Sequence, residues 1–420
     1  MFQVKSQLNK KIISWCLYDW ANSAFATIII TFVFSSYFIN SVAFDKISGT
    51  SSWGWMISIS GFSVACFGPV LGSIADVSSK KTGLFLFTII CALATALLWT
   101  IEADSVFIVR ALVLVGIANF AFEIGMIFYN SMLPNLASRK HMGRLSGLGW
   151  ALGYFGGLSC LALILVSTVQ AETPWFGLDK GNNEHVRACG PFVSLWIFVF
   201  SLPLFIWTTE CNNSHSPSKS IFKALHVTFN SLKKTFSNPI IFKFLLARMI
   251  YTDGLTALFA FGGIFATGTF NFNFDELILF GIIINISAGI GAASFSLIED
   301  KVGSKFVITT CLLSLIILTS LLILIESKTI FWLIGSMLGI FVGPTQSASR
   351  SMMASLSPKE ITSTMFGFYA MSGKVTSFLC PAIIAIVTSY FQSQRIGMAS
   401  IIIFFALGLY LFLSLPNRKY

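Results

Sequence analysis

The chain has 420 residues, of which 55% are hydrophobic and only 10% are charged, and its mean hydropathy is +0.81. A soluble domain carries roughly 25% charged residues, so this composition excludes a water-soluble globular protein. The net charge of +10 would argue for a nucleic-acid partner if the basic residues gathered in one domain or arm, but they are spread between apolar runs. We therefore expect no nucleic-acid partner.

Twelve long apolar runs, separated by polar breaks, follow one another along the chain. A helix needs roughly 20 apolar residues to cross a hydrocarbon layer about 30 Å thick, where only helices and closed barrels pair all their backbone groups. Unbroken apolar runs favour helices, because barrel strands alternate. The sequence thus predicts an all-α polytopic membrane protein with twelve transmembrane helices. They are expected at 13–40, 53–75, 83–101, 105–133, 145–170, 191–208, 241–266, 277–298, 306–325, 331–350, 364–390 and 397–415.

The lysines and arginines indicate the orientation of these helices. An even number of helices places both termini on the same side, and most of the basic residues between helices fall in the loops of that side. Short loops rich in lysine and arginine face the cytoplasm. Both termini are therefore predicted to be cytoplasmic.

The longest polar stretch, 209–240, separates six predicted helices in 1–208 from six in 241–420. We expect two six-helix bundles joined by a cytoplasmic linker. Apolar residues recur in the linker at helical spacing, which leaves two interpretations open: an amphipathic helix on the membrane surface, or a partly ordered linker. These residues are Ile221, Leu225, Phe229, Leu232 and Phe236.

Three pairs of segments indicate that the two halves are copies of each other. The pairs are aligned by offsets of 220, 224 and 234, and the first offset also pairs Gly147 with Gly367. Because six is even, both copies have the same orientation. In that order the pairs are SMLPNLASRK (131–140) with SMMASLSPKE (351–360), DVSSKK (76–81) with DKVGSK (300–305), and YDWANSAF (18–25) with TDGLTALF (252–259).

The segment GSIADVSSKK (72–81) resembles the signature of the loop between helices 2 and 3 in the major facilitator superfamily, and EDKVGSK (299–305) resembles its second copy. The first departs from the signature at Val77 and Ser79, and the second has Ser296 in place of the leading glycine. The resemblance implies a cytoplasmic latch, made by carboxylate contacts to helix termini and arginines. The gating residues it implies are Gly72, Asp76, Lys80, Lys81, Asp300, Lys301, Gly303 and Lys305, with Arg139, Arg144 and Arg350 as partners.

A narrower resemblance begins with WCLYDWANSAFAT (15–27), which is similar to the opening signature of the branch related to the vacuolar amino-acid effluxers of autophagy. YNSMLPNLA (129–137), GRLSGLGWALGYFGG (143–157) and RMIYTDG (248–254) resemble the same branch. The resemblance implies two parallel six-helix repeats and the export or exchange of small solutes, with amino acids as the best-known cargo. It also implies a bacterial-type member in the cytoplasmic (inner) membrane.

Six ionisable residues fall inside the predicted spans, on helices 1, 4, 7 and 11 only. A charge at bilayer depth costs a few kcal/mol on insertion scales, so such residues face a cavity or a partner. The resemblance places helices 1, 4 and 7 around the central cavity and helix 11 beside it. The six residues are Asp19, Arg110, Glu123, Arg248, Asp253 and Lys374.

Glu123 is our preferred proton-coupling residue, because an apolar environment raises the pKa of a carboxyl toward neutrality. The alternative is a buried ion pair with Lys374, which could instead bind a substrate carboxylate or neutralise Asp253. Asp19 and Asp253 hold similar places in the two repeats, and each either serves transport or ties helices together, for example through Arg248. Arg110 lies near the outer end of helix 4, where it can reach the interface.

A set of neutral polar side chains in the spans either binds a zwitterion or knits helices together by hydrogen bonds. They are Tyr18, Asn22, Asn119, Asn130, Tyr154 and Gln346.

Together these features predict a proton-linked secondary transporter of small polar or zwitterionic metabolites, amino acids first. Two alternatives stay open: an exporter of lipids or amphiphiles, and a membrane receptor that has kept the fold without transporting. We expect a monomer with a small-molecule substrate, protons and membrane lipids as partners. No metal spacing, nucleophile motif or phosphate loop is present, so neither a cofactor nor an enzymatic activity is expected.

Overall fold

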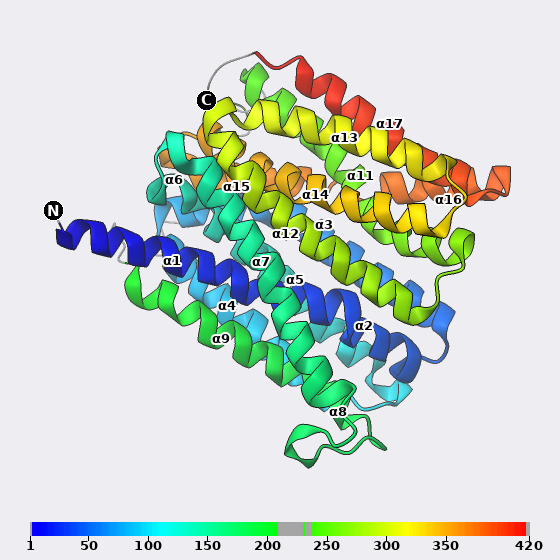
Figure 1. Cartoon of the computed structure of the whole chain (residues 1–420). Coiled ribbons are helices and arrows are strands. Elements are labelled where there is room, and N and C mark those ends of the chain that lie inside the picture. The colour runs from blue at the N-terminus through cyan, green and yellow to red at the C-terminus, as the bar shows by residue number, and fades with distance from the viewer. Residues whose placement is uncertain (1, 209–227, 229, 232, 234–236, 417–420) are drawn as a thin grey trace. The chain divides into compact units, whose positions relative to one another are not determined.

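The computed structural model describes residues 2–208, 228, 230, 231, 233 and 237–416. Within these residues the chain is helical and contains no strand (Figure 1). The apolar residues of the predicted amphipathic helix, Ile221, Leu225, Phe229, Leu232 and Phe236, lie outside the described residues.

The first six predicted spans are confirmed as helices. The first start moves from residue 13 to Phe2, the second from 53 to Lys46, and the other ends shift by a few residues. The first span is not one regular helix, because its β-branched run 27–31 lies in a π-helical segment, a form that is rare except as short bulges. The bounds are α1 Phe2–Ala24, η1 Phe25–Phe32, α2 Phe34–Tyr37, η2 Phe38–Val42, α3 Lys46–Val77, α4 Lys80–Ala96, η3 Leu97–Thr100, η4 Ser105–Phe107, α5 Ile108–Ser131, α6 Leu133–Leu136, η5 Arg139–His141, α7 Met142–Ile164, η6 Leu165–Val169, η7 Trp175–Gly177, α8 Glu184–Arg187 and α9 Cys189–Trp207.

The second six spans are also confirmed, with one interruption. Eleven helices in the described chain are long and apolar enough to cross a membrane, and the twelfth, at the place of predicted helix 11, is represented by the shorter α16. The bounds are α11 Pro239–Phe270, α12 Phe274–Val302, α13 Ser304–Leu324, α14 Lys328–Leu356, η8 Lys359–Ile361, α15 Thr362–Ser372, α16 Leu379–Phe391 and α17 Gln394–Leu413.

The prediction of one continuous helix over 364–390 is wrong. α15 ends at Ser372 and α16 begins at Leu379, so residues 373–378 form a break. Gly373 is a poor helix former, and the hydroxyl of Ser377 donates to the carbonyl of Lys374 at 3.0 Å, a local bond that competes with helix formation. Lys374 therefore lies in the break rather than on a helix.

Contacts group the chain into two compact units. Unit 1 comprises 1–64, 78–129 and 152–214, and unit 2 comprises 65–77, 130–151 and 215–420. The ends of first-repeat helices around 65–77 and 130–151 thus pack with second-repeat residues inside unit 2. The division into bundles 1–208 and 241–420 stays a prediction about the repeats.

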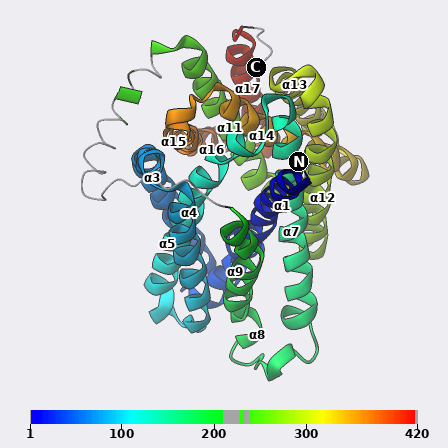
Figure 2. The same ribbon diagram turned by 90° about the vertical axis from the view of Figure 1, so that its left-hand side faces the viewer.

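In unit 1, α9 lies beside both α1 and α4 (Figures 1 and 2). The core of unit 1 is aromatic and aliphatic, with Phe25, Ile28, Phe34 and Phe38 fully buried.

In unit 2, α14 packs on α12 and α13, and α11 packs on α17. The α12–α14 contact depends on glycine: a Cβ at Gly291 would run into the carbonyl oxygen of Ile340, and one at Gly343 into that of Ala288. These two glycines let the helix backbones touch.

Candidate functional site

The carboxylate of Asp76, at the end of α3, is bound to the start of α15. It accepts hydrogen bonds from the backbone N–H groups of Ser363 at 2.8 Å and Thr364 at 2.7 Å, and from the hydroxyl of Thr364 at 2.7 Å. The first N–H groups of a helix lack intrahelical partners and carry the positive end of its dipole. Asp76 therefore satisfies donors that α15 itself leaves free.

Asp300, at the end of α12, makes the equivalent contact with the start of α7. Its Oδ1 accepts from the backbone N–H of Arg144 at 3.0 Å. Its Oδ2 lies 3.9 Å from Nε of Arg144 and 3.7 Å from Nδ1 of His141. Both contacts lie within unit 2, and we call them the Asp76 clamp and the Asp300 clamp.

The two clamps are related by the internal repeat. Asp76 and Asp300 are 224 residues apart, and the helix starts that they bind, at Thr364 and Arg144, are 220 apart. Each carboxylate belongs to one repeat and binds a helix of the other. The geometry supports the carboxylate-to-helix-terminus contacts that the resemblance implied.

Glycine allows the helices to approach at both clamps. A Cβ at Gly72 would lie 2.8 Å from the carbonyl carbon of Ser363, and one at Gly367 would lie 2.6 Å from the Cα of Pro69. At the other clamp, a Cβ at Gly147 would collide with the side chain of Ser296. The missing signature glycine at Ser296 is thus matched by a glycine on the opposing helix.

A buried arginine distinguishes the second repeat. Helix 10, which is predicted to end at 350, continues as α14 to Leu356, and Arg350 is only 1% exposed. Its guanidinium donates to the hydroxyl of Ser146 at 2.9 Å, to the carbonyl of Ser146 at 2.5 Å and to Oδ1 of Asn130 at 3.3 Å. Asn130 is the residue that the offset of 220 aligns with Arg350, so the repeat partners touch.

A buried glutamate lies beside the Asp300 clamp. Glu299 is 4% exposed and accepts from the hydroxyls of Ser351 and Ser304, the latter at 2.7 Å. A Cβ on Gly143 would lie 2.8 Å from its carboxyl carbon. The offsets align Glu299 with Ala75 and Gly143 with Ser363. At the Asp300 clamp the large Glu299 therefore faces a glycine, whereas at the Asp76 clamp the equivalent residues are an alanine and a serine.

Two of the predicted gating lysines lie at helix ends. Lys81, in the first turn of α4, donates to the carbonyl of Thr208 at 2.6 Å, after the end of α9. Lys305, its counterpart in α13, donates to the carbonyls of Leu413 and Leu415 at the end of α17. A cation next to the negative end of a helix is stabilising, and each lysine ties the third helix of its repeat to the last.

The remaining predicted gating residues lie on the loops and helix ends near the clamps. Arg139 and Lys301 are exposed, whereas Lys80 is half-buried at the first position of α4. Gly303 joins α12 to α13 with a φ of +90°, a conformation that favours glycine.

Several predicted substrate-contacting residues of unit 1 join helices instead. The hydroxyls of Tyr18 and Thr88 are hydrogen-bonded at 2.8 Å, and Tyr18 also stacks on Tyr129. The amide of Asn22 donates to the sulfur of Met126 at 3.1 Å, and the amide of Asn119 donates to the hydroxyl of Ser60 at 2.9 Å. Hydrogen bonds of this kind hold membrane helices together.

The other predicted residues of unit 1 are Asp19, Arg110, Glu123 and Tyr154. Asp19 on α1 is buried, Glu123 on α5 and Tyr154 on α7 are half-buried, and Arg110 is exposed. Asp19, Glu123 and Tyr154 all make further contacts.

The predicted charged residues of unit 2 gather around the break between α15 and α16. Of the neutral ones, Gln346 is half-buried on α14 and Asn130 binds Arg350. Arg248 on α11 donates to the carbonyl of Tyr369 at 2.5 Å and to the hydroxyl of Ser372 at 2.8 Å, and its guanidinium lies 3.4 Å from the centre of the Tyr369 ring. Asp253, also on α11, accepts from the backbone N–H of Cys380 at 3.2 Å. Arg248 and Asp253 thus bind the two sides of the break, not each other.

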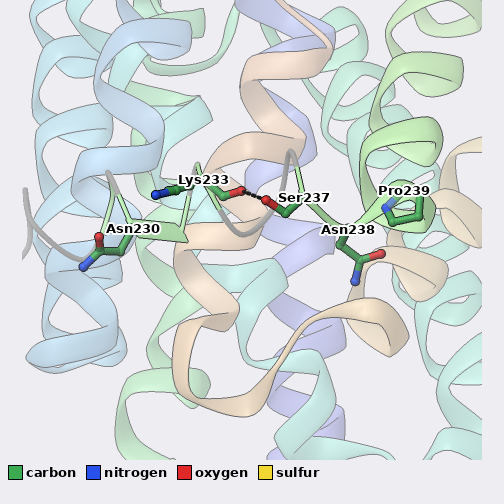
Figure 3. Close-up of a pocket in the computed structure, with 5 residues that line it drawn as sticks. All are labelled: Asn230, Lys233, Ser237, Asn238 and Pro239. Carbon is green, nitrogen blue, oxygen red and sulfur yellow. Dashed lines mark hydrogen bonds between the residues drawn. The ribbon is translucent and has the colours of Figure 1, made fainter.

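A surface cavity of about 640 Å³ lies elsewhere, beside the start of α11 (Figure 3). It is lined by Asn230, Lys233, Ser237, Asn238 and Pro239. These residues belong to the linker region, and we assign this cavity no role. Among the described residues, no group of three or more metal-binding side chains is assembled.

The sequence interpretation missed Ser363, Thr364, His141 and Glu299. A comparison of the repeats at the offset of 224 would have pointed to Glu299, because the equivalent residue is Ala75. No such signal marks Ser363 and Thr364, whose importance comes from their place in the first turn of a helix.

Comparisons with known proteins identify the family of the chain. The family model described as vacuole effluxer Atg22 like matches residues 7–419. The MFS-type transporter YxiO of Bacillus subtilis is 28% identical over 96% of this chain and 94% of its own length, and autophagy-related protein 22 of Kluyveromyces lactis is 23% identical over 86% and 75%.

Solved structures show the same fold. The proton:xylose symporter XylE superimposes with a TM-score of 0.74 at 12% identity, over 97% of this chain and 95% of its own. The transporter FucP in its outward conformation gives 0.73 at 12% identity, over 98% and 99%. The predicted twelve-helix fold is therefore confirmed, and the chain belongs to the vacuole effluxer Atg22-like family of major facilitator transporters.

Proposed function

We propose that this transporter moves small zwitterionic metabolites, amino acids first, by alternating access, and that the two clamps hold its cytoplasmic end closed. The observation that carries the proposal is the reciprocal pair of contacts at Asp76 and Asp300. Each joins one repeat to the other through a carboxylate and the N–H groups of a helix start, without a covalent link.

The chemistry of the clamps suits a gate. A carboxylate bound to a helix start contributes about 0.5–2 kcal/mol to stability. When the contact opens, water can take the place of the carboxylate on the free N–H groups of the helix. Two such contacts stabilise one state by an amount that substrate binding can offset. Contacts of this size are compatible with a two-state transporter, whose states differ by a few kcal/mol.

The choice of cargo rests on the family and on one cation of unit 2. The matching family model is described as an effluxer family. Arg248 on α11, beside the break between α15 and α16, offers a cation for the carboxylate of an amino acid. We propose that a proton is moved with the cargo, with Glu123 as the first residue to test, and that the protein lies in a bacterial cytoplasmic membrane with both termini inside.

The test is a flux measurement on the purified protein in proteoliposomes. Radiolabelled amino acids are offered singly under an imposed pH gradient, and unlabelled lipids or amino acids are added as competitors. We expect accumulation of at least one amino acid, lost when a protonophore removes the gradient. Absence of flux for every amino acid, or competition by lipids alone, would contradict the proposal and favour the amphiphile exporter.

A further inference from the structure

Asp253 lies in α11, next to the first turn of α16, and is 2% exposed. Its Oδ2 accepts the N–H of Cys380. Its Oδ1 is buried, and no hydrogen-bond donor reaches it. One oxygen of this carboxyl is thus bound to a helix start, and the other has no hydrogen-bond partner in the described chain.

The charged and titratable groups around Asp253 are engaged with other partners. On its own helix, Arg248 binds Tyr369 and Ser372, and the hydroxyl of Tyr251 is hydrogen-bonded to that of Ser349 at 2.7 Å. On α14, the residue after Ser349 is Arg350, which binds Ser146 and Asn130.

The elements on the other sides add no cation. α16 contributes the thiol of Cys380, and Lys374 in the break has contacts of its own. From α17, Phe404 and Phe405 pack against Gly254, the neighbour of Asp253. Among the described residues, no basic nitrogen lies within the 4.0 Å that defines an ion pair with Asp253.

This environment does not suit an ionised carboxylate. A buried charge without a counter-ion costs several kcal/mol even after the protein relaxes, whereas a neutral carboxyl with one unpaired oxygen costs much less. The N–H of Cys380, at the positive end of α16, can still stabilise the anion once water reaches Oδ1. The site therefore supports both protonation states, one in a dry and one in a wet environment.

We propose that Asp253 is a proton-binding site, which carries a proton on Oδ1 in this conformation and releases it when the break between α15 and α16 is hydrated. One O–H bond forms from the carboxylate and a proton, and the release is the reverse, so no other reactant is needed. A proton fits better than a metal ion or an ammonium group, because Oδ1 has almost no accessible surface. Only the coupling of this proton to cargo movement rests on the proposed function.

Infrared difference spectroscopy of the lipid-reconstituted protein tests the site without any substrate, because a protonated carboxyl has a carbonyl band separate from the amide bands. We expect a band that is present at neutral pH, shifts in D₂O and is missing from Asp253→Asn. The matched control is Glu172→Gln, which changes an exposed carboxyl in the loop before η7 and should leave the band unchanged.

A second variant keeps the carboxyl and removes its hydrogen bond. Cys380→Pro deletes the N–H that binds Oδ2 at the second position of α16, where a helix tolerates proline. The band should persist at a shifted frequency, and this readout remains if Asp253→Asn does not fold. An unchanged band in both variants would overturn the proposal, as would loss of the band on adding Na⁺ or glycine at constant pH, which would assign the site to a larger cation.

Transport assays test whether the proton on Asp253 is coupled to cargo movement. Asp253→Asn should lose accumulation driven by the pH gradient but keep exchange of labelled for unlabelled cargo. If no amino acid is transported, the proposed function fails while the infrared result still decides the proton site. If accumulation persists in Asp253→Asn although its band is lost, the site binds a proton but the coupling role is wrong.

Discussion

The carboxylate of Asp76 holds Thr364 by two hydrogen bonds, one from the backbone N–H and one from the side-chain hydroxyl, each 2.7 Å long. The two residues are 288 positions apart and belong to different repeats. Such a contact holds a helix start in place only while the carboxylate is there. It therefore gives the most direct test of the clamps.

Asp76→Asn should loosen the start of α15. The amide replaces an acceptor oxygen by a donor and removes the charge, which should cost about 1–2 kcal/mol, the scale of a helix cap. Amide hydrogen exchange in the peptide over 359–366 should become roughly 5- to 30-fold faster, the factor that corresponds to this energy. The control is Asp45→Asn, which alters a cap in an exposed loop of unit 1, and equal rates in Asp76→Asn and the wild type would disprove the clamp.

Asp300→Asn should change access more than affinity, because Asp300 binds the start of α7 and no predicted substrate residue. The maximal rate of exchange in proteoliposomes is expected to change several-fold, while the cargo concentration at half-maximal rate stays nearly constant. Asp104→Asn, the same change at an exposed position of unit 1, is the matched control. A change confined to affinity would place Asp300 in the binding site instead.

Arg350→Met and Arg350→Lys should both destabilise the fold. Loss of the guanidinium leaves buried acceptors unpaired, at a cost of roughly 1–3 kcal/mol for each group, and lysine cannot reproduce the planar guanidinium that reaches both Ser146 and Asn130. Thermal unfolding in detergent measures the loss. Arg139→Met, at an exposed position, should unfold like the wild type, and rescue by lysine would show that only the charge matters.

Gly343→Ala should be destabilising, because its new Cβ would collide with the backbone carbonyl of Ala288 on α12. Overpacking of this kind costs about 1–3 kcal/mol. Gly54→Ala adds the same methyl group where no atom lies within 4 Å, and it should be neutral or slightly stabilising. Thermal unfolding of the two variants separates close helix contact from helix propensity, and equal melting temperatures would count against the close crossing of α12 and α14.

Glu123→Gln should abolish the dependence of transport on the pH gradient and preserve exchange, as the sequence predicts for a coupling carboxyl. Measured in the same proteoliposomes as Asp253→Asn, it shows whether one or both carboxyls carry the proton. Unchanged proton dependence in Glu123→Gln would remove it from the coupling mechanism and leave Asp253 as the candidate.

The sequence was sufficient for the fold because each span is a long apolar run, a signal that does not depend on tertiary contacts. It was also sufficient to predict that Asp76 and Asp300 contact helix starts, because the two residues are equivalent in the repeat. It was not sufficient for the break at 373–378, because Gly373 and Ser377 occur within an apolar stretch that reads as helix. Nor did it give the burial of Arg350, since an arginine near a predicted helix end is normally solvated, and only the fold surrounds it with partners.

The reciprocity of the clamps has the form of a twofold-symmetric dimer contact. In such an interface, residue i of one subunit meets residue j of the other, and j meets i. A six-helix ancestor carrying one carboxylate and one helix start would have made both clamps with a second copy of itself, using a single set of residues. Once the copies were fused, each could diverge alone. The two repeats differ where Glu299 is equivalent to Ala75 and Arg350 is equivalent to Asn130.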